Sequence, residues 1–266
     1  ASGQAIGRLT ELRNLRLSAE GREWRKEEFA DMFEGLENLE TCYLPDMRVD
    51  QESGEPTIQF PETLQVLEWK SDSVLREFRN VERLLTLPWL YGINLSCIDA
   101  SLNPVIWRLL SVRQAPVTSL GIKARHLQDA VVSPDVESLF VHDMLTLDEF
   151  LLLPRLFPGL RNLSFVPSKE DERVPRSRHV VLDEHCLGDL SSLTELHLRK
   201  CMPVEKVDAL FSLGFSLRTL TATIRDQEQM NELFRSLPAL ESVQLNVDTL
   251  TVEETIHLSS SPTLRR

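Results

Sequence analysis

Residues 193–198 read Leu-Thr-Glu-Leu-His-Leu, and this short phrase decides how the chain folds. It consists of an apolar residue, two residues of any kind, a second apolar residue, one usually polar residue and a third apolar residue. Ten copies follow one another, at residues 12–17, 39–44, 64–69, 90–95, 117–122, 136–141, 160–165, 193–198, 217–222 and 240–245. Their mean spacing is about 25 residues, and a unit of that size cannot bury its own apolar face. The units are therefore predicted to stack on one another.

Within each phrase the apolar residues alternate with a polar one, which is typical of a short β-strand. Between the phrases the apolar spacing changes to that of an amphipathic helix, at residues 29–36, 75–85 and 230–237. Thr146 and Glu149 form the sequence of a capping box, which predicts that a helix begins at Leu147 and extends to Phe157. Each unit is thus expected to hold one strand and one helix or shorter turn.

The predicted fold class is α/β. A strand that returns to a parallel neighbour needs a crossover, and crossovers are right-handed. The expected fold is therefore a right-handed horseshoe-shaped solenoid, with parallel strands on the concave face and helices on the convex face. One domain of about ten repeats is predicted to cover residues 1–266.

Two steps of the repeat are irregular. The step from Phe165 to Leu198 contains a charged segment between Pro167 and His179, which is expected to be an insertion. The step from Ile122 to Val141 is too short for a full helix and is expected to hold a turn or an abbreviated helix. No capping segment is recognised at either end, and an eleventh phrase begins at Leu264, so the chain is expected to be a piece of a larger protein.

The composition argues against several classes of partner. The formal net charge of −12 disfavours nucleic acid and anionic membrane surfaces, both of which attract clustered Lys and Arg. No apolar run reaches the length of a membrane-spanning helix. The four cysteines are scattered and form neither a disulfide cap nor a metal motif, which favours an intracellular, cytoplasmic location.

The ten phrases resemble the leucine-rich-repeat superfamily over nearly the whole chain. Small secreted repeats carry Asn three residues after the third apolar position, and this chain never does; only Cys201 fits the alternative Asn-or-Cys pattern there. The irregular repeats are most similar to ribonuclease-inhibitor-like arrays, as in F-box substrate receptors and intracellular immune receptors. The resemblance implies target recognition, with further domains attached in the full-length protein.

The sequence offers few candidates for catalysis or metal binding. It lacks a glycine-rich phosphate loop, a nucleophile elbow and a His-Glu-x-x-His pair. The acid pairs Asp148–Glu149 and Asp183–Glu184 lie near expected helix starts, where carboxylates interact favourably with the positive end of the helix dipole. The spacing of His179, His185, Cys186 and Cys201 matches no structural zinc pattern. Neither a cofactor nor a metal is expected, and the chain is not expected to be an enzyme, although a site within the insertions is a third alternative.

The informative positions are the outward-facing residues of the strands, because stacking aligns them into rows on the concave face. Tyr43 and Phe140 are expected to be exposed aromatic anchors there. The predicted partner-binding residues are Arg16, Tyr43, Glu68, Lys70, Asn94, Lys123, Phe140, His142, His197 and Arg199.

The expected function is recognition of a protein partner through this face, as in the substrate-recognition part of a ubiquitin-ligase receptor. The alternative is a ligand-sensing or autoinhibitory segment of an intracellular immune-type receptor.

Overall fold

The computed structural model describes residues 2–17, 23–24, 26–44, 48–49, 58–69, 78–95, 98, 100–127, 129–143, 145–166, 187, 189–198, 210, 212–224 and 226–247. The chain divides into two compact units, residues 1–131 and 132–266, and each is described by itself. The charged insertion at 167–179 and the eleventh phrase at Leu264 lie outside the described residues.

Unit 1 is built on five parallel strands, each of which coincides with one copy of the phrase. They are β1 (Asn14–Arg16), β3 (Thr41–Leu44), β5 (Val66–Trp69), β6 (Gly92–Asn94) and β7 (Ser119–Ile122). Neighbours pair at the same position of the phrase: Leu15 with Cys42, Cys42 with Leu67, Leu67 with Ile93 and Ile93 with Leu120. A short second sheet of β2 (Glu23–Trp24) and β4 (Arg48–Val49) was not predicted.

Unit 2 repeats this arrangement with five more parallel strands. They are β8 (Ser138–Val141), β9 (Asn162–Phe165), β10 (Glu195–His197), β11 (Thr219–Ile224) and β12 (Ser242–Val247). The paired central residues are Leu139, Leu163, Leu196, Leu220 and Val243. The predicted α/β class with parallel strands is confirmed, whereas the horseshoe shape stays a prediction.

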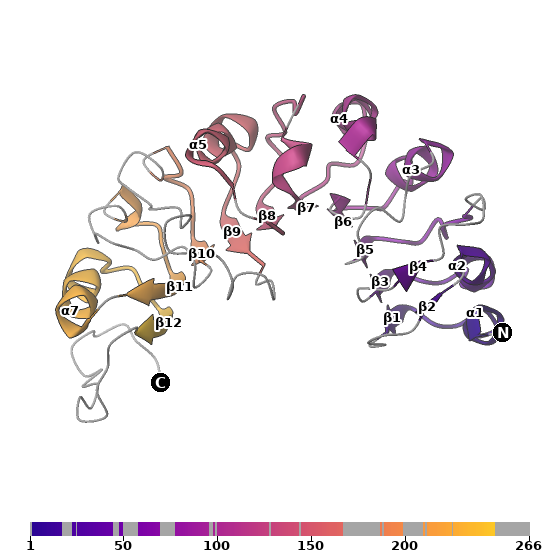
Figure 1. The fold of residues 1–266 in the computed structure, drawn as a ribbon, viewed down its shortest axis with the longest axis horizontal. Coiled ribbons are helices and arrows are strands. Elements are labelled where there is room, and N and C mark those ends of the chain that lie inside the picture. Colours follow the sequence, from indigo (N-terminus) through magenta and orange to yellow (C-terminus); the bar gives the residue numbers. More distant parts are fainter. Residues whose placement is uncertain are drawn as a thin grey trace. The chain divides into compact units, whose positions relative to one another are not determined.

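The helices lie on one side of the strands in each unit (Figure 1). Unit 1 contains α1 (Ser2–Gly7), α2 (Lys26–Glu34), α3 (Phe78–Leu85), η2 (Ala100–Leu102), α4 (Asn103–Ser111) and the 3₁₀ turn η3 (Ala124–His126). Unit 2 contains α5 (Leu147–Leu156) and α7 (Gln227–Ser236). The four predicted helices are present, and η3 is the abbreviated turn expected in the short step.

Helix α1 was not predicted from the sequence. It packs against α2 so closely that a side chain on Gly35 would come within 1.8 Å of the carbonyl oxygen of Gly7. A side chain on Gly3 would meet the carbonyl oxygen of Glu28 at 2.0 Å. Glycine is therefore required at this helix contact, which lacks the leucine phrase and so escaped prediction.

The inward positions of the phrase form the core, as predicted. Leu67, Ile93, Leu163 and Leu196 are all at most 3% exposed. Helix α5 packs onto the strands through the Phe150 ring, which stacks on Phe165 with centroids 5.9 Å apart. Leu17 is only half-buried, and the Trp69 side chain lies outside the described part.

One backbone contact links every pair of successive strands within each unit. The carbonyl of the residue preceding a strand accepts hydrogen bonds from two consecutive backbone amides at the start of the next phrase. The carbonyl of Arg13, for example, accepts from Glu40 at 2.8 Å and from Thr41 at 3.0 Å. The same pair of bonds is formed by the carbonyls of Glu40, Gln65 and Tyr91 in unit 1, and of Glu137, Arg161, Thr194 and Arg218 in unit 2. These bonds fix the register from one strand to the next.

Candidate binding surface

The outward face of β1, β3 and β5 brings three predicted residues together. Strand register places Arg16 beside Tyr43, and Tyr43 beside Glu68. The Arg16 guanidinium carbon lies 6.0 Å from the centroid of the Tyr43 ring, within cation–π range. Tyr43 remains 38% exposed. This part of the face therefore presents an aromatic ring between a cation and a carboxylate.

The next part of the same face differs from the prediction. Asn94 of β6 is only 4% exposed, and Gly92 and Gly121 beside it are buried as well. A side chain on Gly92 would meet a methyl group of Val66 at 3.2 Å, so β5 and β6 leave little room for one. Asn94 is therefore buried, and its prediction as an accessible contact residue is wrong.

In unit 2 the outward face carries a connected row of polar side chains. Asn162 Nδ2 donates to Glu195 Oε2 at 2.8 Å, and the same carboxylate oxygen lies 3.9 Å from His197 Nε2. His197 Nδ1 hydrogen-bonds with Thr221 Oγ1 at 2.9 Å. The row spans β9, β10 and β11, so each side chain is oriented by a neighbour on the next strand.

Phe140 is half-buried rather than exposed, which corrects its expected role as an exposed anchor. It lies beside Ser164 in the strand register, and Ser164 lies beside His197. His142 is half-buried too. Both belong to the outward rows of unit 2, but each offers only part of its surface to a partner.

The remaining predicted contact residues do not contribute to a described row. Lys70 and Arg199 lie outside the described residues. Lys123 is half-buried next to η3, and its backbone amide donates to Nδ1 of His126 at 3.1 Å.

His126 is a structural residue that the sequence analysis missed. Its side chain is fully buried, and Nε2, which carries the proton because Nδ1 is an acceptor, donates to the carbonyl of Ile98 at 3.2 Å. Burial lowers the pKa of His126 to about 4. The imidazole thus joins the turns after β6 and β7.

Arg113 is a second missed residue and lies after α4. Its guanidinium donates to the carbonyls of Leu85, Leu87 and Leu90, and its Nε donates to the carbonyl of Ala115. Partial burial lowers the pKa of Arg113. Nothing in the sequence signals this role, because three of its acceptors lie more than 20 residues away.

The chemical alternatives gain no support from the described residues. Glu149 forms the predicted capping box, because its Oε2 accepts a hydrogen bond from the Thr146 amide at 2.7 Å. Within the described ranges no three His, Cys, Asp or Glu side chains gather in a way that could hold a metal ion. His179, His185, Cys186 and Cys201 lie outside those ranges. Burial raises the pKa of Cys42 to about 12, so this thiol is not a nucleophile.

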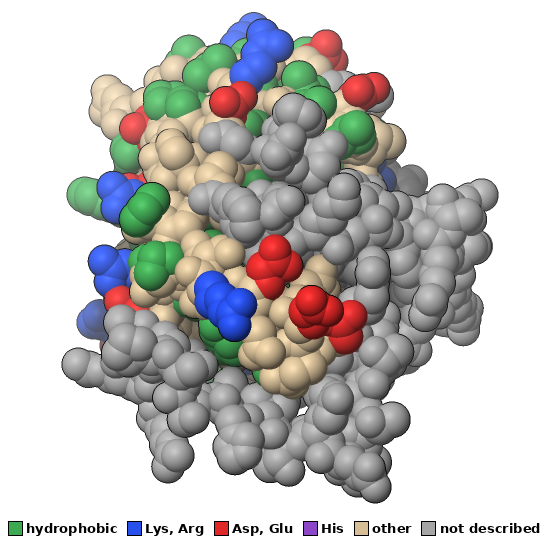
Figure 2. Space-filling model, turned by 90° about the vertical axis from the view of Figure 1, so that its left-hand side faces the viewer, with side chains coloured by type: hydrophobic (Ala, Val, Ile, Leu, Met, Phe, Trp, Pro, Cys, Tyr) green, Lys and Arg blue, Asp and Glu red, His purple; other side chains and the backbone are tan. Residues whose placement is uncertain are grey.

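The surface seen in Figure 2 shows basic, acidic and hydrophobic side chains interspersed over its described part. No helix among the described residues is both long and apolar enough to cross a bilayer. No model of a known protein family matches the chain, and a comparison with curated proteins finds no significant match.

Proposed function

We propose that the chain is a leucine-rich-repeat solenoid that binds another protein through the outward face of its strands. The observation that carries this proposal is the register, which aligns one outward side chain per strand into rows. Repeated stacking of this kind produces extended binding surfaces rather than enclosed pockets. We further place the protein in the cytoplasm, where unpaired cysteines such as the buried Cys42 persist as thiols.

Two described clusters support different contributions to this surface. The Arg16–Tyr43–Glu68 cluster in unit 1 supplies an aromatic anchor that is oriented by strand pairing. The Asn162–Glu195–His197–Thr221 row in unit 2 supplies hydrogen-bonding groups that are already held in place. Preorganised side chains lose less conformational entropy on binding, which favours protein recognition by both clusters.

Affinity capture with the full chain tests the proposal. Tyr43→Ala and His197→Ala remove one outward side chain from each cluster. The matched control is Glu232→Ala, which removes an exposed side chain from α7 on the helical side. Partners bound by the native chain should be lost with the outward variants and retained with the control. An unchanged set of partners with both outward variants would contradict the proposed use of the strand face.

A further inference from the structure

A second exposed surface lies away from the outward rows, in the turns that precede the strands of unit 1. These turns, here named the unit 1 rim, comprise residues 9–13, 36–40, 61–65, 87–91 and 114–118. Trp89 is 67% exposed and Tyr91 is 43% exposed, and both belong to the turn before β6. Large aromatic side chains of this kind are the residues most often found at the centre of binding interfaces.

The backbone that carries the two aromatic residues is held firmly. The Tyr91 amide donates to the carbonyl of Gln65 at 2.9 Å, and the Tyr91 carbonyl accepts from Thr118 and Ser119 at 3.0 Å each. Arg113 donates to the carbonyls of Leu87 and Leu90 on either side of Trp89. Trp89 and Tyr91 are therefore presented on a fixed support, which lowers the entropy lost when a partner binds.

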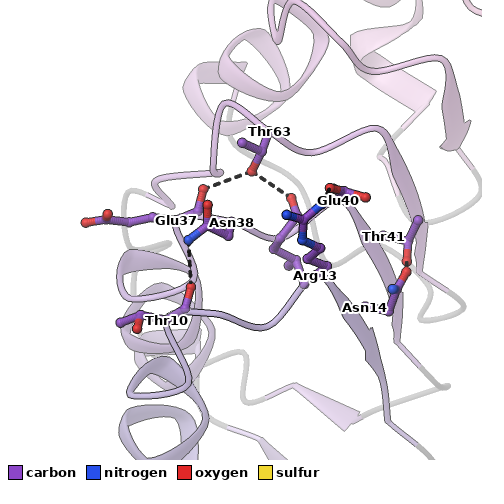
Figure 3. A network of polar contacts seen from close by, with 9 residues as sticks. Thr10, Arg13, Asn14, Glu37, Asn38, Glu40, Thr41 and Thr63 are labelled. Atoms are coloured by element: carbon purple, nitrogen blue, oxygen red, sulfur yellow. Dashed lines mark hydrogen bonds and ion pairs between the residues drawn. The ribbon is translucent and has the colours of Figure 1, made fainter.

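Side chains also tie together the preceding turns of the rim (Figure 3). Asn38 Nδ2 donates to the carbonyl of Thr10 at 3.0 Å, and Thr63 Oγ1 donates to the carbonyls of Glu37 and Leu39 at 2.9 Å each. These bonds link three successive turns into one continuous edge. The Glu37 side chain points away from this network.

The charge of the rim decides which partner it fits. Its carboxylates are Glu11, Glu37, Glu40 and Glu62. Two basic side chains lie at the rim: Arg13 forms an ion pair with Glu40 at 2.9 Å, and Arg113, next to residue 114, donates to the carbonyls of Leu87 and Leu90. Glu11, Glu37 and Glu62 are exposed. The rim thus combines two aromatic rings with an excess of negative charge. Guanidinium groups stack on aromatic faces and also pair with carboxylates, so arginine satisfies both features.

We propose that the unit 1 rim binds an extended, arginine-containing segment of a partner protein. An arginine side chain stacks on Trp89 or Tyr91, while neighbouring basic groups face Glu62 and Glu37. This surface is separate from the outward strand face, so the two proposals stand or fall independently.

Unit 2 offers a matched control for the aromatic contribution. Phe215 is 93% exposed and occupies an equivalent turn, before β11. The charged group nearest to it in the chain is Arg218, which lies 2.5 Å from Glu241. Phe215 therefore tests exposed aromatic character in a turn that the unit 1 rim does not include.

Fluorescence anisotropy of a labelled peptide of alternating arginine and glycine, titrated with the full chain, tests the proposal. We expect binding that weakens about tenfold in Trp89→Ala, and binding by Phe215→Ala that equals the native chain. Glu62→Gln should weaken binding at low salt and reduce its salt dependence. A peptide of alternating glutamate and glycine should not bind.

The proposal is overturned if the arginine peptide fails to bind, if the glutamate peptide binds as tightly, or if Trp89→Ala and Phe215→Ala behave alike. Tyr91→Ala provides an independent second variant should Trp89→Ala not fold, as judged by its thermal melting curve. An unchanged affinity in Tyr91→Ala would then refute the assignment of the rim aromatics as the anchors.

Discussion

At the scale of single residues, His126 makes the stability of unit 1 depend on pH. Its pKa of about 4 lies below that of an unfolded histidine because the buried imidazole is stable only when neutral. Between the folded and unfolded pKa values the unfolded state binds the additional proton. The contribution of His126 is thus fully present above about pH 6.5 and is lost as the pH falls toward 4.

We expect this loss to reach about 2 kcal/mol near pH 5. Urea unfolding of the native chain and of His126→Gln, at several pH values between neutral and 5, measures it. Carboxylates titrate in both proteins, so the difference between the two curves isolates the histidine. The native chain should lose its advantage as the pH falls. Parallel curves would show that His126 does not titrate with folding.

At the scale of secondary-structure elements, the capping box of α5 should contribute a measurable amount of stability. The Thr146 hydroxyl accepts from the Glu149 amide at 3.3 Å, and the Glu149 carboxylate accepts from the Thr146 amide at 2.7 Å. Thr146→Ala should lower the free energy of unfolding by about 1 kcal/mol, and Thr146→Ser by less. Chemical denaturation measures both. Equal losses for alanine and serine would contradict a capping role for the hydroxyl.

Arg113 stabilises an element boundary through contacts that are distant in sequence. Its side chain donates to carbonyls of the turn between α3 and β6. Replacing it with Met should cost about 2–3 kcal/mol, since buried carbonyls lose a charged donor. Arg113→Lys should recover only part of the loss, because an ammonium group cannot reach acceptors as far apart as a planar guanidinium can. Thermal and urea unfolding compare the variants. Full recovery by lysine would indicate that charge alone, rather than the spread of donors, stabilises the turn.

The capping box of α5 and the contacts of Arg113 show what the sequence can and cannot predict. The capping box lies within four residues, so its spacing alone indicated where α5 begins. The contacts of Arg113 with Leu85, Leu87 and Leu90 depend on the stacking of successive repeats, and no local sequence pattern indicates them. For the same reason the phrase predicted the strands and the buried leucines but not α1, whose close contact with α2 depends on glycines.

At the scale of the whole molecule, the candidate surface was harder to predict than the core. Strand periodicity determines that Asn94 points to the outward side, as Tyr43 does. It does not determine what covers that side, and Asn94 is buried whereas Tyr43 is not. Trp89 and Tyr91 lie in the turn before β6 and therefore outside the strand rows, to which the predicted contact residues were restricted. Exposure depends on the path of the connecting segments, which the phrase leaves unspecified.

The pairing of each strand with its neighbours also predicts that a destabilising mutation in one repeat affects mainly the adjacent repeats. Leu196 of β10 is fully buried and lies between Leu163 of β9 and Leu220 of β11. Leu196→Ala should cost about 2–5 kcal/mol. In a stack whose members contact only their neighbours, amide hydrogen exchange should accelerate most in β9, β10 and β11 and least in β1 and β3.

Hydrogen exchange followed by mass spectrometry distinguishes this outcome from global unfolding. The matched control is His197→Ala, which alters the adjacent residue on the outward face and leaves the buried row intact. It should change exchange little, because a half-exposed side chain contributes less to stability than a buried leucine. Equal acceleration in the ten strands that coincide with the phrases would mean that Leu196→Ala unfolds as a single cooperative body. Acceleration confined to the strands around β10 would instead support a stack of units that are stabilised by their immediate neighbours.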